Sequence, residues 1–210
     1  MFERRLRLSN WMHIALLIVA ILALLSVFRA LHPSNSEPPP TGQIMKVPPY
    51  NQGDYTTTVA VINGLKKSVK TSGCGAACVA SVGQYMTGDK SYDPQSLFEW
   101  AHENGYYHGD GLGHDALSAM AKLFKLRSKW TDSEETVLKS LRAMRPVVAH
   151  MAHGTFSTGT GHYIILTGVT DDGLIVVHDP GSRKRSGKAY DLDLIIKESK
   201  GNQPFMIVGA

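Results

Sequence analysis

The order in which helix and strand patterns follow one another constrains the fold of this 210-residue chain most strongly. Up to residue 144, apolar residues recur at helical spacing in segments that begin near a capping residue. After residue 145 the pattern changes to short runs rich in β-branched residues. We predict helices over 74–86, 94–104, 114–126, 133–144 and 192–198, and strands over 146–151, 162–169, 174–179 and 204–208. Helices first and antiparallel strands second indicate an α+β fold.

Two turns predict hairpins within this order. Asn63-Gly64 separates the β-branched run 55–62 from the segment "LKKSVK", and Asn-Gly is a strong signal for a two-residue hairpin turn. The sequence Asp171-Asp172-Gly173 separates the strands 162–169 and 174–179 in the same way. We therefore expect both pairs of segments to be antiparallel neighbours.

An apolar segment near the N-terminus predicts a membrane anchor. Ile14 to Phe28 holds no charged residue, and with residues 11–13 it falls within the roughly 17–25 residues of a membrane span. Arg4, Arg5 and Arg7 precede it, which favours a cytoplasmic N-terminus and an extracytoplasmic domain. The alternative is a cleaved signal peptide, but Phe28 at the −3 position makes a poor cleavage site after Ala30. We expect a cytoplasmic basic flank (1–10), a transmembrane anchor (11–31), a Pro-rich linker (32–45) and one domain (46–210).

The net charge is carried mostly by the membrane flank. The chain has a formal net charge of +4, of which residues 1–32 carry +3. The remaining +1 does not indicate a nucleic-acid surface, and we expect no nucleic-acid partner. The one basic cluster is interpreted as part of a solvated loop: Arg183, Lys184, Arg185 and Lys188.

The two cysteines lie in "TSGCGAACVASVGQYM", residues 71–86. Ser72 is a plausible N-cap, which places Cys74 in the first turn of a helix, where the unpaired N–H groups and the helix dipole lower a thiol pKa. Cys78 lies one turn further on. Because i and i+4 Cβ atoms lie about 5–6 Å apart, and a disulfide needs about 3.5–4.5 Å, we expect a nucleophile, Cys74, beside a buried small residue, Cys78.

A cysteine nucleophile needs a base and a group that orients the base. His162 begins a predicted strand after a glycine-containing loop, and Asp179 ends the next strand. If these strands pair through the turn at 171–173, the two side chains lie near one another, and the carboxylate fixes the imidazole tautomer.

Four motifs together resemble one enzyme family. The segments "VPPYNQGDY", "SGCGAACVASV", "GTGHYIILTGV" and "DDGLIVVHDP" are similar to the papain-like cysteine peptidases of the bacteriocin-processing, double-glycine-leader type, particularly their stand-alone secreted relatives. The resemblance covers most of residues 46–210. It implies a papain-like fold with Cys74 as nucleophile, His162 as base, Asp179 as orienter and Gln52 as an oxyanion-hole donor. In the leader-processing members the glutamine stands a few residues before the cysteine, whereas here 21 residues intervene, and the Asn63-Gly64 hairpin can absorb them.

The expected function is thus a membrane-anchored extracytoplasmic cysteine peptidase with a peptide or protein substrate and no cofactor. Hydrolysis of cell-wall peptides by the same chemistry and a catalytically silent peptide-binding module remain alternatives. A metal site of His150, His153 and His178 is disfavoured because alternation along a strand places 150 and 153 on opposite faces. Three further polar residues are interpreted as loop and helix-cap residues outside the substrate cleft: Asp110, His114 and Asp115.

Overall fold

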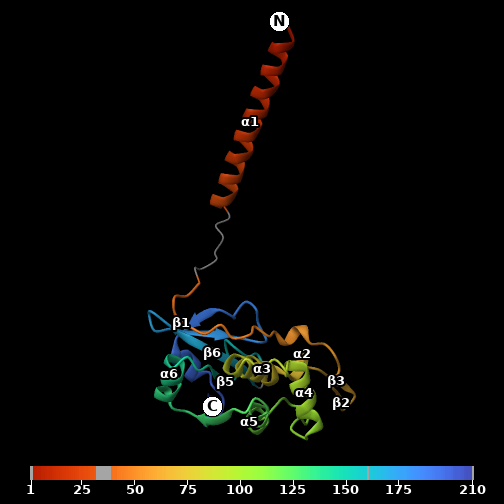
Figure 1. The fold of residues 1–210 in the computed structure, drawn as a ribbon, viewed down its shortest axis with the longest axis vertical. Coiled ribbons are helices and arrows are strands. Elements are labelled where there is room, and N and C mark those ends of the chain that lie inside the picture. The colour runs from red at the N-terminus through yellow and green to blue at the C-terminus, as the bar shows by residue number, and fades with distance from the viewer. Residues whose placement is uncertain (1, 32–38, 160, 210) are drawn as a thin grey trace. The chain divides into compact units, whose positions relative to one another are not determined.

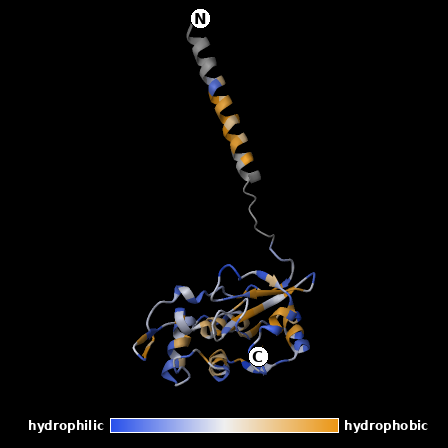
Figure 2. Ribbon diagram, turned by 180° about the vertical axis from the view of Figure 1, so that it is seen from behind, coloured by the Kyte–Doolittle hydropathy of each residue, from blue (hydrophilic) through white to orange (hydrophobic). Residues whose placement is uncertain are grey.

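The computed structural model describes residues 2–31, 39–159 and 161–209, and within the N-terminal helix the side chains of residues 11–24 and 27. The chain divides into two compact units, Met1–Pro38 and Pro39–Ala210. The first contains helix α1 (Phe2–Leu31), which includes residues 11–31, the expected transmembrane anchor. Apolar residues dominate its described part (Figure 2). Within the described residues, no helix combines the length and apolarity needed to cross a bilayer, so the predicted membrane span is not supported.

The second unit is built on one antiparallel sheet. Its strands lie in the order β4-β9-β5-β6-β7-β8, and β1 pairs with β6. The strand bounds are β1 Gly42–Ile44, β4 Arg127–Thr131, β5 Val147–Met151, β6 His162–Thr170, β7 Ile175–His178, β8 Lys188–Tyr190 and β9 Phe205–Gly209. Strands β2 (Ala60–Ile62) and β3 (Leu65–Lys67) form a separate hairpin, as Asn63-Gly64 predicts; both turn residues have positive φ, 51° and 75°.

Helices cover both faces of the sheet. The bounds are α2 Val69–Ser72, α3 Cys74–Thr87, α4 Pro94–Glu103, α5 His114–Leu123, α6 Glu134–Arg142 and α7 Leu192–Lys197, with a 3₁₀ turn η1 at Gln52–Asp54. Figure 1 shows α3, α4 and α5 grouped together. Alternation along β6 divides the core: Tyr163 and Ile165 pack with residues of these helices, while Ile164 and Leu166 pack with residues of α6 and α7. The predicted α+β architecture is confirmed.

Helix α3 is the central element of the larger helical layer. Every residue from Gly75 to Gln84 is buried, so the helix has no long solvent-facing stripe. Two glycines make this possible: a Cβ at Gly75 would lie 2.8 Å from Leu117 Cδ1, and a Cβ at Gly83 would lie 2.5 Å from the ring of Phe124. The run of small residues after Cys74 therefore serves close packing on all sides.

The boundaries differ from the sequence predictions at several points. Gly73, not Ser72, is the N-cap of α3, because residues 69–72 form their own short helix. Ser133 caps α6 through its hydroxyl, whereas the predicted helix over 133–144 included Ser133 as its first residue. Strands β1, β4 and β8 were not predicted. Strands β1 and β8 have three residues each, too few to show alternation, and β1 lies within the expected Pro-rich linker. Strand β4 lies at the sheet edge, and Trp130 is its sole large apolar residue.

Candidate active site

Cys74 is the first residue of helix α3. Gly73 permits this start, because a Cβ at Gly73 would lie 2.6 Å from Val69 Cα, and any larger residue would push α2 away from α3. The N–H of Cys74 belongs to the first helical turn, whose N–H groups have no intrahelical acceptor. These donors and the positive end of the helix dipole favour the thiolate over the thiol. The predicted position of Cys74 in the first turn is confirmed.

His162 and Asp179 meet across the hairpin of β6 and β7. His162 begins β6, and Asp179 directly follows β7, which pairs with β6 through Ile165 and His178. The Nε2 atom of His162 lies 2.7 Å from Oδ1 of Asp179. Their predicted proximity is confirmed. Because Nε2 is engaged by the carboxylate, Nδ1 is the ring nitrogen that remains for Cys74, whose thiol and the imidazole shift each other's pKa.

Arg185 completes this cluster. Its Nε donates a hydrogen bond of 2.6 Å to Oδ2 of Asp179, and the Gly181 N–H donates one of 2.7 Å to Oδ1. Asp179 is fully buried, so the arginine and the imidazole supply the charge compensation that water would otherwise give. The interpretation of the basic cluster as a solvated loop is therefore wrong for Arg185. Arg183 does fit it, since it forms an exposed ion pair with Asp54.

The charges of Cys74 and His162 stabilise one another. Burial opposes ionisation of the Cys74 thiol, but the hydrogen bond and the charge of His162 hold the thiol pKa below its ordinary value. Burial alone would lower the pKa of His162, whereas the hydrogen bonds to Asp179 and Cys74 raise it to about 9. Both shifts favour the pair of a thiolate and an imidazolium over the neutral pair.

Cys78 has the opposite electrostatic environment. It is fully buried in the core, and burial raises its thiol pKa well above the ordinary value, with the charges of Cys74 and Asp179 adding to the effect. Both cysteines are free thiols. Cys78 is thus an uncharged core residue, as we expected, and Cys74 is the thiol with nucleophilic character.

Gln52 lies between the segments that carry the other site residues. Its backbone N–H donates to the Pro180 carbonyl at 2.8 Å, next to Asp179. Its side-chain Nε2 donates to the Lys70 carbonyl at 3.0 Å, four residues before Cys74. One amide hydrogen of Gln52 is engaged by that bond, and the amide group carries two. The hairpin of β2 and β3 returns the chain as predicted, so the long sequence gap does not keep Gln52 away from this region.

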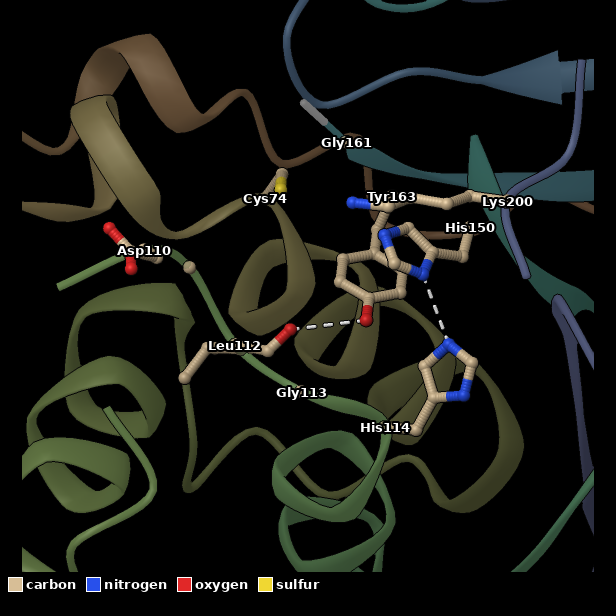
Figure 3. A pocket seen from close by; sticks show the side chains of 10 residues that line it. Cys74, Asp110, Leu112, Gly113, His114, His150, Gly161, Tyr163 and Lys200 are labelled. Atoms are coloured by element: carbon tan, nitrogen blue, oxygen red, sulfur yellow. Dashed lines mark hydrogen bonds between the residues drawn. The ribbon is translucent and has the colours of Figure 1, made fainter. Parts of the chain in front are cut away.

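A cavity adjoins Cys74 (Figure 3). It has a volume of about 250 Å³, and its walls come from the loop before α5, from β5, from the start of β6 and from the segment after α7. Asp110 and His114 are among the lining residues. Asp110 lies in the loop before α5 and His114 begins that helix, as we expected. Their position beside Cys74 was not predicted, because a sequence gives no sign of which loop folds back over a helix terminus. Asp115 is a first-turn residue of α5, as we expected.

The histidines of the rejected metal site have separate partners. His150 shares a hydrogen bond with His114, at 3.0 Å between Nδ1 and Nε2. His178 Nε2 lies 3.1 Å from the Tyr50 carbonyl oxygen. Over residues 2–31, 39–159 and 161–209, no group of three or more His, Cys, Asp or Glu residues is arranged to hold a metal ion.

Comparison with known proteins gives one family. Residues 44–202 match the Peptidase_C39 like family. Solved structures of peptidases share the fold. A putative C39-like peptidase from Bacillus anthracis is 16% identical, with a TM-score of 0.57 over 83% of this chain and 99% of that one. The peptidase domain of Streptococcus ComA, a bifunctional ABC transporter involved in a quorum-sensing pathway, is 17% identical, with a TM-score of 0.51. The match covers 66% of this chain and 90% of that one. No curated protein matches the sequence.

Proposed function

Because the chain belongs to the Peptidase_C39 like family, we propose that it is a cysteine peptidase that hydrolyses peptide bonds through Cys74, His162 and Asp179. The observation that carries the proposal is the imidazole of His162 held against the buried Asp179 carboxylate, beside a thiol whose pKa the same imidazole lowers. Each group has the charge that the reaction needs, since the thiol pKa is lowered and the imidazole pKa is raised.

The reaction proceeds through an acyl-enzyme. The Cys74 thiolate attacks the carbonyl carbon of the scissile bond, and the electron pair of the C=O bond moves to oxygen. When the tetrahedral intermediate collapses, the C–N bond breaks, and His162 gives its Nδ1 proton to the leaving amine. Neutral His162 then removes a proton from water, whose oxygen attacks the thioester carbon. Collapse of this second intermediate releases the carboxylic acid and restores the thiolate and the imidazolium.

The oxyanion formed in each step requires hydrogen-bond donors. The N–H of Cys74, in the first turn of α3, is one candidate donor. We assign the second to the Gln52 side-chain amide, which the family resemblance implies. Its position between Pro180 and Lys70 supports this assignment.

The test of the activity is a comparison of the two cysteines. Cys74→Ala should abolish both peptide hydrolysis and alkylation by iodoacetamide at neutral pH. Cys78→Ala removes a buried sulfur and should keep both, with a stability loss of about 1 kcal/mol or less for a small volume change. Labelling and hydrolysis that survive in Cys74→Ala would overturn the proposal. Labelling without hydrolysis in the wild-type protein would favour the silent binding module instead.

The same chemistry can act on cell-wall peptides, since both substrate classes offer amide bonds. Purified cell-wall peptides tested beside a peptide library separate the two substrate classes.

We also retain the N-terminal anchor as a proposal, supported by the three arginines that precede the apolar segment. In that case the full chain should resist carbonate extraction from membranes, and protease added to intact cells should remove the catalytic domain. A soluble form beginning near residue 31 would show a cleaved signal peptide.

A further inference from the structure

The cavity beside Cys74 has a polar side formed by Lys200 and His150. Both residues line the cavity, and their side-chain nitrogens converge over Gly161. A Cβ at Gly161 would lie 2.9 Å from His150 Nε2 and 3.0 Å from Lys200 Nζ. Figure 3 shows the two side chains approaching each other on one side of the cavity, with the Lys200 ammonium directed toward Cys74. The absence of a side chain at Gly161 keeps the space between these nitrogens and the cavity open.

Both residues are held by neighbouring groups. The backbone N–H of Lys200 donates to the His150 carbonyl at 2.8 Å, which ties the segment after α7 to strand β5. The His150 ring stacks on Tyr163, with centroids 4.3 Å apart, and its Nδ1 is hydrogen-bonded to His114. His114 is in turn stacked on Trp130 at 3.6 Å. These contacts orient the polar side of the cavity before any ligand arrives.

The charge on this side comes from Lys200. Burial, the neighbouring His114 and Lys200 itself lower the pKa of His150 to about 4, so its imidazole is neutral near pH 7. Burial also lowers the pKa of His114. Asp110 is the acidic lining residue of the cavity, and Figure 3 places it on the opposite side of Cys74 from Lys200. The cavity therefore has a cationic wall of Lys200 with a neutral imidazole beside it.

We propose that this cavity is a specificity subsite for an acidic side chain, Asp or Glu, of the peptide substrate. The carboxylate would pair with the Lys200 ammonium and approach His150 Nε2, while the rest of the side chain lies against Tyr163 and Leu112. Because Cys74 lines the same cavity, the acidic residue would lie near the cleaved bond. The inference rests on the proposed peptidase function, since it names the substrate class of that site.

The first experiment profiles cleavage of a randomised peptide library by the full chain. Wild type should favour Asp and Glu at one position next to or near the scissile bond. A Glu substrate should exceed its Gln counterpart in kcat/KM by about tenfold, the factor that corresponds to roughly 1.4 kcal/mol. Lys200→Glu should reverse the preference toward Lys or Arg at the same position. Lys139→Glu, on the exposed face of α6, makes the same charge change away from the cavity and should leave the preference unchanged.

The second experiment measures binding without chemistry. In Cys74→Ala, saturation-transfer NMR should show stronger binding of an Ala-flanked peptide with a central Glu than of its Gln counterpart, and adding Lys200→Glu should reverse that order. Equal cleavage or equal binding of Glu and Gln peptides would overturn the subsite assignment. If the wild type cleaves peptides without an acidic preference, the peptidase proposal stands and the subsite falls. If no peptide is cleaved but Glu peptides bind selectively, the subsite stands and the peptidase proposal falls.

Discussion

Asp179 is the buried charge at the centre of the candidate site. Its Oδ1 accepts from His162 and from the Gly181 N–H, and its Oδ2 accepts from Arg185. Burial would raise its pKa, but the bonds and charges of His162 and then Arg185 hold the pKa below the ordinary value. The carboxylate therefore stays ionised without exposure to water, and it orients the imidazole from a fixed position.

Arg185→Gln should destabilise the fold because it removes a partner of this buried carboxylate. Breaking a fully buried pair costs about 3–5 kcal/mol. Here we expect roughly 1–3 kcal/mol, since the Arg185 side chain is 31% exposed and two other donors remain. Arg183→Gln, on the same loop, breaks an exposed ion pair and should cost about 1 kcal/mol or less. Urea unfolding at pH 7 measures both.

The pH dependence of this contribution follows from the lowered pKa of Asp179. The stability that the ionised carboxylate provides is present above its unfolded-state pKa and is lost as pH falls through the folded-state pKa. The difference in free energy of unfolding between wild type and Arg185→Gln should therefore become smaller as the pH falls. Equal losses of stability in Arg183→Gln and Arg185→Gln at pH 7 would contradict a structural role for the bond between Arg185 and the buried Asp179.

We expect the Cys74 and His162 pair to set the pH profile of peptide hydrolysis. With its pKa raised to about 9, His162 keeps its proton through neutral pH and loses it as pH rises through that value. The Cys74 pKa is lowered, so the thiolate forms below the ordinary thiol range. We expect kcat/KM to rise on the acid side and to fall near pH 9, with both limbs belonging to the coupled pair.

Asp179→Asn supplies the control for that assignment. It removes the carboxylate that raises the His162 pKa, so the alkaline limb should move to lower pH. Alkylation of Cys74 by iodoacetamide needs only the thiolate, so it should show no alkaline fall in either protein, which identifies the alkaline limb of hydrolysis with loss of the His162 proton. An alkaline limb that stays near pH 9 in Asp179→Asn would assign it to another group.

Among the elements, helix α3 does most to position Cys74, because it is buried from Gly75 to Gln84. Its small residues let α5 and β6 approach closely, which brings Tyr163 and His162 to the same end as Cys74. Any added volume on α3 must be absorbed by neighbours that also shape the site.

Gly83→Ala should reduce stability although alanine favours a helix by about 1 kcal/mol. The new Cβ would lie 2.5 Å from the Phe124 ring, and overpacking of this kind costs about 1–3 kcal/mol. Adding Phe124→Leu should restore part of the loss, which a double-mutant cycle by thermal unfolding detects as a favourable coupling. Gly209→Ala, which meets no atom within 4 Å, is the matched control. Additive effects of the two core substitutions would contradict the packing argument.

Long periodic elements were predictable from the sequence, and short edge elements were not. The helix capped by Asp93 and the strands β5, β6, β7 and β9 have patterns that span most of their length. Strands β1 and β8 are held by pairing with β6 and β7, and no local pattern shows such pairing. At the site, His162 and Asp179 were predictable because they flank one hairpin turn. Arg185 and His114 were missed because their roles depend on loops that fold back onto the site.

The whole molecule assembles the candidate site from segments far apart in the sequence. The turn η1 contacts the loop after β7 twice: Gln52 N–H donates to the Pro180 carbonyl, and Asp54 pairs with Arg183 across 129 residues. The same turn reaches the segment before α3 through the Gln52 side chain. The position of Gln52 is therefore fixed only when both halves of the domain have folded together, so its role must be tested in the folded full-length protein.

Gln52→Ala tests whether this assembly serves catalysis. Acyl transfer places negative charge on the scissile carbonyl oxygen, and loss of one oxyanion donor lowers kcat by roughly 10²–10³. We expect that loss with a nearly unchanged KM. The lost bond to the Lys70 carbonyl should cost about 1 kcal/mol of stability. Alkylation of Cys74 should stay fast, because the thiolate depends on His162 and the helix terminus. Asp54→Asn weakens the exposed pair of the same turn and should leave kcat near wild type. If the single-turnover acylation rate of Gln52→Ala lies within about threefold of the wild-type rate, the loss is too small for an oxyanion donor. Gln52 would then make a purely structural contact.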